Sequence, residues 1–428
     1  MSFIYSTLTS VINRISDAFH ESFLFTTIFT LLEFIENQWI NSYFKKFYPS
    51  DNFLGFLNNS AVLKNHIFNP LIVLVLFAMF LMLSVNKLSA SLVITLIIAF
   101  VGFFIGTAIL PRNFLNNNLK NILQFEKKDI YSIGFCLMLV SIVFFFICIA
   151  SVRGIPLIKP SIRYLLKPAF TMPVFLIIPG TCLVASAHLK DFQDKKITRS
   201  QARFRFLFLL VIDCAFLLLL GYRTPVLAAF LVIIIIGFYG NIVSLWEVIV
   251  GALIGISAII GIGYFRSLGE MTITSSTNPL STLQSRADFT LHVLNLLDFI
   301  GGNFGLTHGH MLASSIPGSD LGPRMMVGKL IAWRTEVTVT PTLIGQMVVD
   351  FGKVGVFFGM LLLGFVLGIG FKLMQITKNY FYIGIYSLIL TYTILGVETG
   401  ILDIQVLLYF AIAILIYLIN MAKCKNPA

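Results

Sequence analysis

The sequence predicts an all-α protein that crosses a membrane about ten times. Hydrophobic residues make up 57% of the chain and charged residues only 11%, with a mean hydropathy of +0.92. A soluble domain carries about a quarter charged residues. Runs near the length that crosses the hydrocarbon layer, about 20 residues as a helix, recur along the chain. The expected spans are 69–85, 88–110, 130–150, 169–187, 204–221, 225–240, 246–264, 352–371, 380–396 and 404–421.

Residues 1–66 come before the first span and are predicted to form an interfacial amphipathic segment on the cytoplasmic surface. Apolar residues such as Phe23 and Phe29 recur at helical spacing, and acidic residues such as Glu33 interrupt them. The run Ser22–Ile35 is too short to cross a bilayer and too apolar for water, which is typical of a helix lying in the interface. An eleventh, distorted span is the alternative.

The connection His188–Arg205 sets the predicted orientation, because it carries six Lys and Arg residues and short basic loops stay in the cytoplasm. Alternation from there puts both termini in the cytoplasm of a multi-pass cell-membrane protein. The net charge of +11 then reflects orientation rather than a nucleic-acid partner. The expected divisions are the segment 1–66, spans one to seven in 67–264, a large extracytoplasmic loop with amphipathic helices in 265–351, and spans eight to ten in 352–428.

Neither a metal nor a cofactor is expected. The five cysteines are scattered, mostly inside apolar runs, which favours neither a disulfide framework nor a zinc site. The sequence also lacks a glycine-rich phosphate loop, so a nucleotide-sugar site is not expected.

The turn Gly221–Pro225 separates two apolar runs and places Arg223 at the outer membrane boundary. Pro225 has the fixed φ suited to a first helical position, so a helix is expected to start there. One interpretation is an arginine that reaches ordinary phospholipid headgroups. The other is an arginine that binds a specific anionic ligand.

The loop 265–351 is long enough to carry function. It is expected to contain an amphipathic helix, on the membrane or over a cavity, that opens with a capping box of Ser281 and Gln284. Polar residues including Asp288 and His292 recur on one face of this helix. A solvated face is the plainer interpretation of this stripe, and a catalytic face is the alternative.

Two histidines, His308 and His310, alternate beyond this helix as in a strand or an extended loop. Two histidines without a third ligand are a weak basis for a metal site. Histidine side chains titrate near neutral pH and serve as general bases, so either residue is a candidate base. A plain hydrogen-bonding role is the alternative.

Arginines are frequent on the predicted outer side, where the positive-inside tendency should have depleted them. The planar guanidinium suits bidentate recognition of phosphate. The excess therefore predicts an anionic partner, of which a lipid-linked diphosphate is the most natural. Seven of the twelve arginines lie on this side: Arg153, Arg163, Arg223, Arg266, Arg286, Arg324 and Arg334.

Asp213 is a lone carboxyl at the middle of an expected span. A charge at that depth is costly and is a functional candidate by default. A protonated carboxyl, hydrogen-bonded between helices, is the alternative.

Three segments, in order along the chain, resemble the oligosaccharide repeat-unit polymerases of the O-antigen polymerase type. Their Gly-Ile-Pro-Leu loop is similar to RGIPLIKPSIRY at Arg153–Tyr164. Their Gly-x-Arg-Thr-Pro turn is similar to GYRTP at Gly221–Pro225. The segment that leads their long outer loop into the next span is similar to Thr340–Gly368. Together these segments cover the chain from about 130 to 370.

The resemblance implies a multi-helix glycosyltransferase fold of the lipid-donor (GT-C-like) class. It implies a metal-independent polymerase of cell-envelope polysaccharide, which transfers a growing oligosaccharide from a polyprenyl-diphosphate donor to a lipid-linked repeat unit at the outer face. Membrane lipid, a chain-length regulator and a flippase are the further partners expected. The candidate diphosphate-binding residues are Arg223, Arg324 and Arg334, then Arg153, Arg163 and Arg266; the candidate bases are His310 and His308, then Glu336 and Asp288.

Two other functions stay open. A glycan ligase of similar architecture would use similar arginines and move the glycan to a different acceptor. A lipid-linked oligosaccharide flippase or secondary transporter would instead show internal repeats and charge at mid-depth. In this sequence Asp213 is the only charge expected at mid-depth and no internal repeat is found, whereas arginines lie at the predicted outer surface, which favours transfer over transport.

Overall fold

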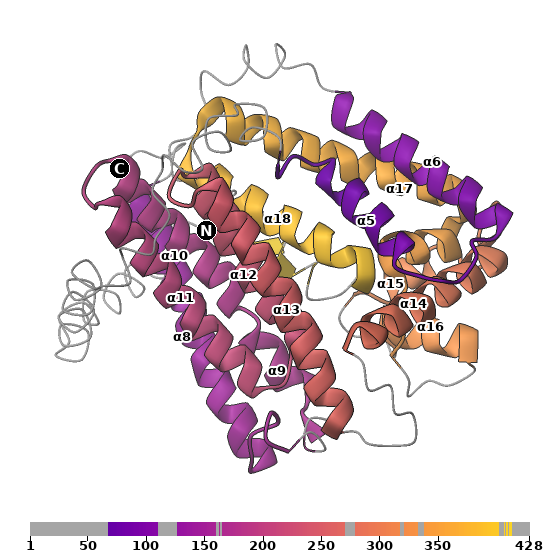
Figure 1. Ribbon diagram of the computed structural model, residues 1–428, viewed down its shortest axis with the longest axis horizontal. Helices are drawn as coiled ribbons and strands as arrows, with labels where there is room; N and C mark the ends of the chain where they lie inside the picture. The colour runs from indigo at the N-terminus through magenta and orange to yellow at the C-terminus, as the bar shows by residue number, and fades with distance from the viewer. Residues whose placement is uncertain are drawn as a thin grey trace, which may run out of the picture. The chain divides into compact units, whose positions relative to one another are not determined.

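The computed structural model of the chain describes residues 67–109, 126–159, 162, 165–269, 279–316, 321–332, 338–401, 406, 408–409 and 411–412. Within these ranges the regular secondary structure is helical, without a β-strand (Figure 1). Residues 1–66 and most of the expected span 404–421 lie outside the described residues, so both of those predictions stay predictions.

A helix lies in each expected span range that comes before residue 400. Five helical segments of the described chain are long and apolar enough to cross a membrane: α6, α8, α9 with α10, α17 and α18. The prediction of an all-α polytopic membrane protein is therefore confirmed, while the number of ten spans stays a prediction. The helices are α5 (Ile72–Met82), α6 (Ala90–Ala108), α8 (Lys127–Val152), α9 (Pro168–Val174), α10 (Ile177–Gln193), α11 (Arg199–Leu219), α12 (Arg223–Tyr239), α13 (Leu245–Gly269), α14 (Pro279–Gly301), α15 (His310–Ala313), α16 (Pro323–Ala332), α17 (Thr342–Thr377) and α18 (Tyr380–Thr399).

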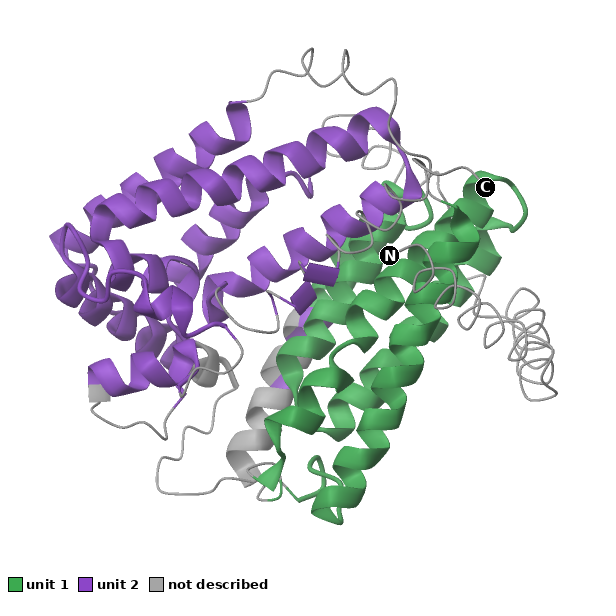
Figure 2. Ribbon diagram, turned by 180° about the vertical axis from the view of Figure 1, so that it is seen from behind, with its two compact units in different colours: residues 1–66, 124–253 green, residues 67–123, 254–428 purple. Residues whose placement is uncertain are grey.

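The chain forms two compact units (Figure 2). Unit 1 holds α8 to α12 and the start of α13. Unit 2 combines α5 and α6, from early in the chain, with α14 to α18 from its second half. Their bounds are 1–66 with 124–253 for unit 1, and 67–123 with 254–428 for unit 2.

In unit 1, α8 and α10 pack with their backbones in contact at two glycines. A Cβ atom on Gly134 would lie 2.8 Å from the carbonyl oxygen of Gly180, so a larger side chain would push the helices apart. Close to this crossing, the hydroxyl of Thr181 on α10 donates to Oδ1 of Asp213 on α11 at 2.8 Å. Asp213 is fully buried, and its Oδ2 has no hydrogen-bond partner among the described residues. The carboxyl is thus hydrogen-bonded between helices.

The basic connection His188–Arg205 of unit 1 is mostly helical. It contains the end of α10, a short turn and the start of α11, which opens with a capping box of Thr198 and Gln201. Such a box satisfies two free N–H groups of the first turn. The break between the two helices is therefore only five residues long, 194–198.

In unit 2, α6 and α17 also pack backbone to backbone. A Cβ atom on Gly106 would lie 2.2 Å from the carbonyl oxygen of Leu361, and one on Gly364 would lie 2.3 Å from that of Phe103. Gly102 and Gly106 on α6, and Gly364 and Gly368 on α17, form two Gly-x-x-x-Gly pairs, which let membrane helices approach closely.

Helix α17 is interrupted at Gly352, whose φ of 62° and ψ of −152° are not helical. The sequence predicted that a membrane span begins at residue 352, and the interruption coincides with that boundary. The part of α17 before Gly352 contributes Val349 to an apolar core with residues of α14, α15 and α16, formed by Val293, Leu297, Met311, Val327, Val339 and Val349. The part of α17 beyond Gly352 continues as the apolar span.

Candidate active site

The two candidate histidines lie on a loop that connects α14 to the short helix α15. His308 is exposed and has a φ of 45°, in the left-handed region, and Gly309 follows with a φ of 97°. His310, also exposed, is the first residue of α15. The expected strand or extended loop is therefore a tight turn, and it presents both imidazoles at the surface.

The carboxylate of Asp350 on α17 holds this loop in place. Its Oδ1 accepts hydrogen bonds from the hydroxyl of Thr307 (2.6 Å) and the backbone N–H of Gly309 (3.0 Å). The same oxygen accepts from the N–H of Met311 at 2.9 Å, and Oδ2 accepts from the N–H of Leu312 at 2.8 Å. Asp350 is only 2% exposed. Hydrogen bonds to a charged acceptor are about twice as strong as those between neutral groups, so a buried carboxylate with four donors fixes the turn.

Backbone contacts add a second attachment of the loop to α17. The N–H groups of Leu306 and Thr307 donate to the carbonyl oxygen of Val349, and that of His308 donates to the carbonyl oxygen of Asp350. Gly305 has a φ of 84°, and a Cβ there would lie 2.2 Å from the same Asp350 carbonyl. Only glycine fits such a position. The His308–His310 turn is therefore attached to the last residues of α17 before its interruption.

Arg324 belongs to the same packed assembly as His310. It is the second residue of α16, and its carbonyl oxygen accepts from the N–H of Val339 at 3.1 Å. Helix α16 packs on α14 and α15, with Val327 of α16 and Met311 of α15 in one buried core. The structure thus places the predicted diphosphate-binding Arg324 and the predicted base His310 on neighbouring elements of unit 2.

Two residues of the polar face of α14, Asp288 and Asn295, are hydrogen-bonded to the connection between α5 and α6. Oδ1 of Asp288 accepts from the hydroxyl of Ser84 at 2.5 Å and from the backbone N–H of Val85 at 2.8 Å. Oδ1 of Asn295 accepts from the N–H of Ser89 at 3.3 Å. The Ser84 hydroxyl bond, with help from the backbone N–H groups, lowers the pKa of Asp288 below the usual value of an aspartate. A carboxylate held as the anion by such donors is suited to positioning the chain more than to accepting a proton.

Two further bonds attach α14 to its neighbours. Oδ1 of Asp298, which is fully buried, accepts from the hydroxyl of Thr95 on α6 at 2.6 Å. Near the other end of α14, Nε of Arg286 donates to Glu398 in an ion pair with the end of α18. Arg286 was predicted only as one of the outer arginines, and the structure gives it this carboxylate partner. The interpretation of the α14 stripe as a solvated face holds for His292, which is exposed.

Unit 1 brings together the two segments that carry Arg153 and Arg223. Arg153 ends α8 in a left-handed conformation with a φ of 51°. In the segment that follows, the N–H of Leu157 donates to the carbonyl oxygen of Leu219 at 3.1 Å, close to the turn before Arg223. The Tyr222 ring packs edge-on against Phe175, with ring centroids 5.2 Å apart. The two resemblance motifs of unit 1 are therefore neighbours in space.

Arg223 is the first residue of α12, so the helix begins two residues earlier than the expected start at Pro225. The N-cap residue Tyr222 gives the helix no side-chain cap. The first N–H groups of a helix carry partial positive charge, and anions are stabilised there. Arg223 adds a guanidinium, half-buried in the structure, at this helix start.

The remaining predicted site residues lie outside what the structure describes. Three of them, Arg163, Arg334 and Glu336, are outside the described residues, and the side chain of Arg266 in α13 is likewise not described. Their assigned roles stay predictions. Within the described chain, no group of three or more His, Cys, Asp or Glu residues is placed to hold a metal ion.

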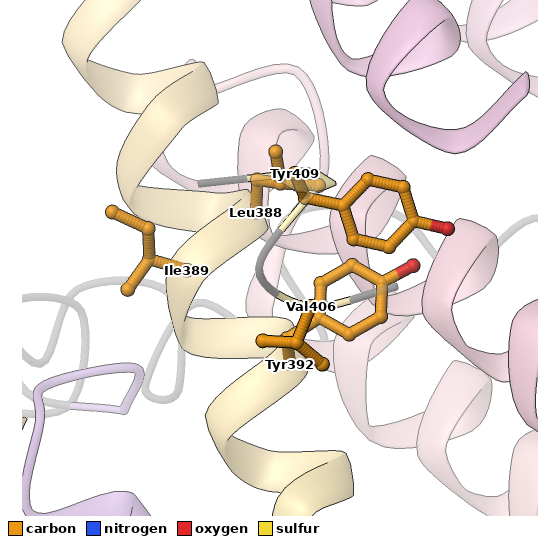
Figure 3. A pocket seen from close by; sticks show the side chains of 5 residues that line it. All are labelled: Leu388, Ile389, Tyr392, Val406 and Tyr409. Carbon is orange, nitrogen blue, oxygen red and sulfur yellow. The ribbon is translucent and has the colours of Figure 1, made fainter. Parts of the chain in front are cut away.

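A separate hollow lies beside α18, away from the predicted residues in sequence. It is shallow and is lined by apolar side chains and two tyrosines. The rings of Tyr392 and Tyr409 lie with centroids 4.5 Å apart at an interplanar angle of 35°, and their hydroxyls point the same way (Figure 3). None of the candidate site residues lines it.

Comparison with known proteins identifies the family. The family described as "Putative O-antigen polymerase" matches residues 66–410. The chain belongs to the O-antigen polymerase family. An uncharacterized protein of Methanocaldococcus jannaschii is 30% identical over 317 residues, which cover 72% of this chain and 82% of that protein. No solved structure matches the chain.

Membership of the O-antigen polymerase family confirms the resemblance read from the three sequence segments. It indicates a membrane glycan polymerase, an enzyme of the glycosyltransferase type. The match begins at residue 66, so the segment before the first helix of unit 2 lies almost wholly outside it. Asp350, in contrast, lies within it and was not singled out from the sequence. The sequence signal that could have identified it is an acidic residue directly before Phe351 and Gly352, where the apolar span begins.

Proposed function

We propose that this member of the O-antigen polymerase family extends a lipid-linked glycan. The donor is an oligosaccharide on polyprenyl diphosphate, and the acceptor is a lipid-linked repeat unit. Both are used at the extracytoplasmic face. The observation that carries the proposal is the construction of the His308–His310 turn, which Asp350 fixes beside the helix that bears Arg324.

The proposed reaction replaces one bond at the anomeric carbon of the donor sugar. A hydroxyl of the acceptor sugar attacks that carbon while the bond to the diphosphate oxygen breaks. His310 or His308 takes the proton of the attacking hydroxyl as general base. Polyprenyl diphosphate leaves with the bonding electrons and therefore gains negative charge.

Guanidinium groups meet this developing charge in the proposal, in the place of a metal ion. Preorganised donors aimed at a leaving group lower the barrier because they need no rearrangement during the reaction. Arg223 is supported in this role by its position at the uncapped start of α12. Arg153 is supported by the hydrogen bond that joins its segment to the residues before Arg223. Arg324, Arg334, Arg163 and Arg266 complete the proposed set.

The test uses the full-length protein in lipid vesicles, supplied with a polyprenyl-diphosphate oligosaccharide. Wild-type protein is expected to produce a ladder of longer lipid-linked products. Arg223→Lys keeps the positive charge and loses the planar fork, so extension should fall by about a hundredfold or more, the scale of losing one preorganised donor. Wild-type product length from this variant would remove Arg223 from the mechanism.

The matched control is Arg199→Lys in the same unit. Nε of Arg199 donates to the carbonyl oxygen of Ile242, and Nε of Arg203 donates to the same oxygen, so the bond is duplicated. Extension by the Arg199→Lys protein should stay close to wild type. His308→Gln and His310→Gln, assayed across a range of pH, identify the base as the residue whose loss removes the acidic limb of the rate profile.

A further inference from the structure

The segment Phe299–Ile316, which carries both histidines, is unusually apolar at its surface. Eighteen consecutive residues contain no Asp, Glu, Lys or Arg. Phe299 is 85% exposed, Phe304 76% and Ile316 61%, and Leu306 and Leu312 are about half exposed. Soluble surfaces rarely gather large apolar side chains in this way, and such a patch marks an interaction site.

The patch is continuous with the face of α17 that is exposed along the apolar span. Beyond the interruption at Gly352, Val354, Phe358 and Leu362 are exposed at spacings of four, which places them on one side of that helix. Phe351, just before the interruption, is exposed as well. Phe351 also touches the histidine turn, because a Cβ on Gly309 would lie 3.5 Å from its Cζ. The exposed side of a membrane span faces lipid, and the loop extends that side beyond the span.

The lysines of α17 fix the depth of the loop. Between Lys353 and Lys372 the chain holds 18 residues without a charge, about 27 Å as a helix, close to the thickness of the hydrocarbon layer. Lys353 therefore marks one membrane boundary. Three residues before it, Asp350 holds the histidine turn, and the N–H of Lys353 donates to the carbonyl oxygen of Gly302 at 3.3 Å.

From the exposed apolar side chains, their continuity with α17 and the position of Lys353, we infer that Phe299–Ile316 is a membrane-insertion loop. Its partner is the bilayer surface. Phe304, Leu306 and Ile316 enter the boundary between headgroups and acyl chains, as the apolar face of an interfacial helix does. His308 and His310 then lie at the level of the lipid phosphates.

The loop also has a consequence for the substrate, which rests on the proposed function. A polyprenyl-diphosphate donor keeps its chain in the bilayer and its diphosphate at the headgroup level. The histidines of an inserted loop meet that diphosphate without lifting the lipid out of the membrane. The donor tail then packs against the exposed side chains of the loop.

Insertion is tested on the full-length protein in vesicles that contain a phospholipid with a diazirine in its acyl chain. After illumination, mass spectrometry locates the lipid adducts. We expect adducts on Phe299–Ile316 as well as on α17 around Phe358, which serves as the positive control. The turn at Lys195 and Lys196 is polar and exposed and should carry none. Labelled α17 with an unlabelled loop would overturn the inference.

A kinetic experiment tests the substrate consequence separately. In Phe304→Asn/Leu306→Asn, both exposed apolar side chains become polar, which should leave the fold intact. The KM for a long-chain polyprenyl donor should rise about tenfold, while the KM for a short-chain, water-soluble donor and kcat for both stay unchanged. An equal change for both donors contradicts the role in tail binding. If wild-type protein extends no glycan at all, the proposed function is wrong. The lipid-adduct experiment still tests membrane insertion in that case, because it does not depend on activity.

Discussion

The two units of the molecule pack their helices in the same way and differ in the partners of their polar side chains. Each unit joins two helices at glycines, and each buries an aspartate against a threonine of a neighbouring helix. In unit 1 several of the further polar bonds are made by basic side chains. Arg199 and Arg203 donate to the carbonyl oxygen of Ile242, and Lys127 pairs with Asp191.

In unit 2 two acidic side chains make comparable hydrogen bonds, and they accept from backbone N–H groups. Asp288 holds residues 84–86, and Asp350 holds residues 307–312. Loops are where binding and catalytic groups are usually displayed, and a carboxylate with several N–H donors fixes the shape of a loop. The comparison indicates that unit 2 builds a defined non-helical surface, whereas unit 1 presents its arginines from helix ends.

Enlarging the glycine contact should have the largest effect, and a larger one in unit 2 than in unit 1. Gly106→Leu would force side-chain atoms into the backbone of α17, at a position already 2.2 Å from a carbonyl oxygen for Cβ alone. We expect a loss of about 3 kcal/mol or more in stability, or no folded protein. Gly134→Leu, where the equivalent distance is 2.8 Å, should cost less. Unfolding in mixed micelles measures both, and a reversed order would contradict the α6–α17 packing.

Removing the Asp350 carboxylate should release the histidine turn without unfolding α17. Asp350→Ala leaves three N–H groups and a hydroxyl without their acceptor, so the opening free energy of the loop should fall by roughly 3 kcal/mol. Amide exchange at residues 306–312 should rise about a hundredfold, while exchange in α18 stays unchanged. Asp350→Asn keeps one acceptor oxygen and should show a smaller rise. Unaltered exchange in the alanine variant would show that the backbone bonds alone hold the loop.

The buried aspartate–threonine pairs should contribute less, and equally in the two units. Double-mutant cycles of Asp213→Ala with Thr181→Val, and of Asp298→Ala with Thr95→Val, should each give a coupling energy of about 0.6 kcal/mol, the average for side-chain hydrogen bonds in membrane proteins. Glycan extension by Asp213→Asn should stay within twofold of wild type. A complete loss of extension in that variant, with normal folding, would restore Asp213 as a functional carboxyl.

Asp288 should give the smallest effect, and a pH-dependent one. Its pKa is lowered in the folded protein, so its stabilising bonds to residues 84–86 are fully present above the unfolded pKa, near pH 4. They weaken as pH falls through the lower folded value. Amide exchange at residues 84–86 should therefore be slower in the wild-type protein than in Asp288→Asn near neutral pH. The two exchange rates should become equal only in acid. A difference that is constant down to pH 2 would contradict the bond to the carboxylate.

The sequence predicted the helices and the family more fully than it predicted the site. Apolar runs located the spans, and the start expected at residue 352 coincides with the interruption at Gly352. The Asp350 contacts could not be predicted, because they join residues 38 to 43 positions apart and depend on how α14 and α17 pack. The polar stripe of α14 was interpreted as solvated because helical spacing shows that a face is polar and not what covers it.

The close contact of α6 with α17 has a consequence for biosynthesis. More than two hundred residues separate the two helices, and at roughly 5 to 20 residues per second their synthesis takes some 10 to 50 seconds. During this delay α6 is in the membrane and its glycine side has no partner helix to pack against. Residues 124–253 of unit 1 are synthesised in the same period and can fold. The speed of translation through residues 109–341 therefore sets how long α6 stays in the membrane without its partner helix.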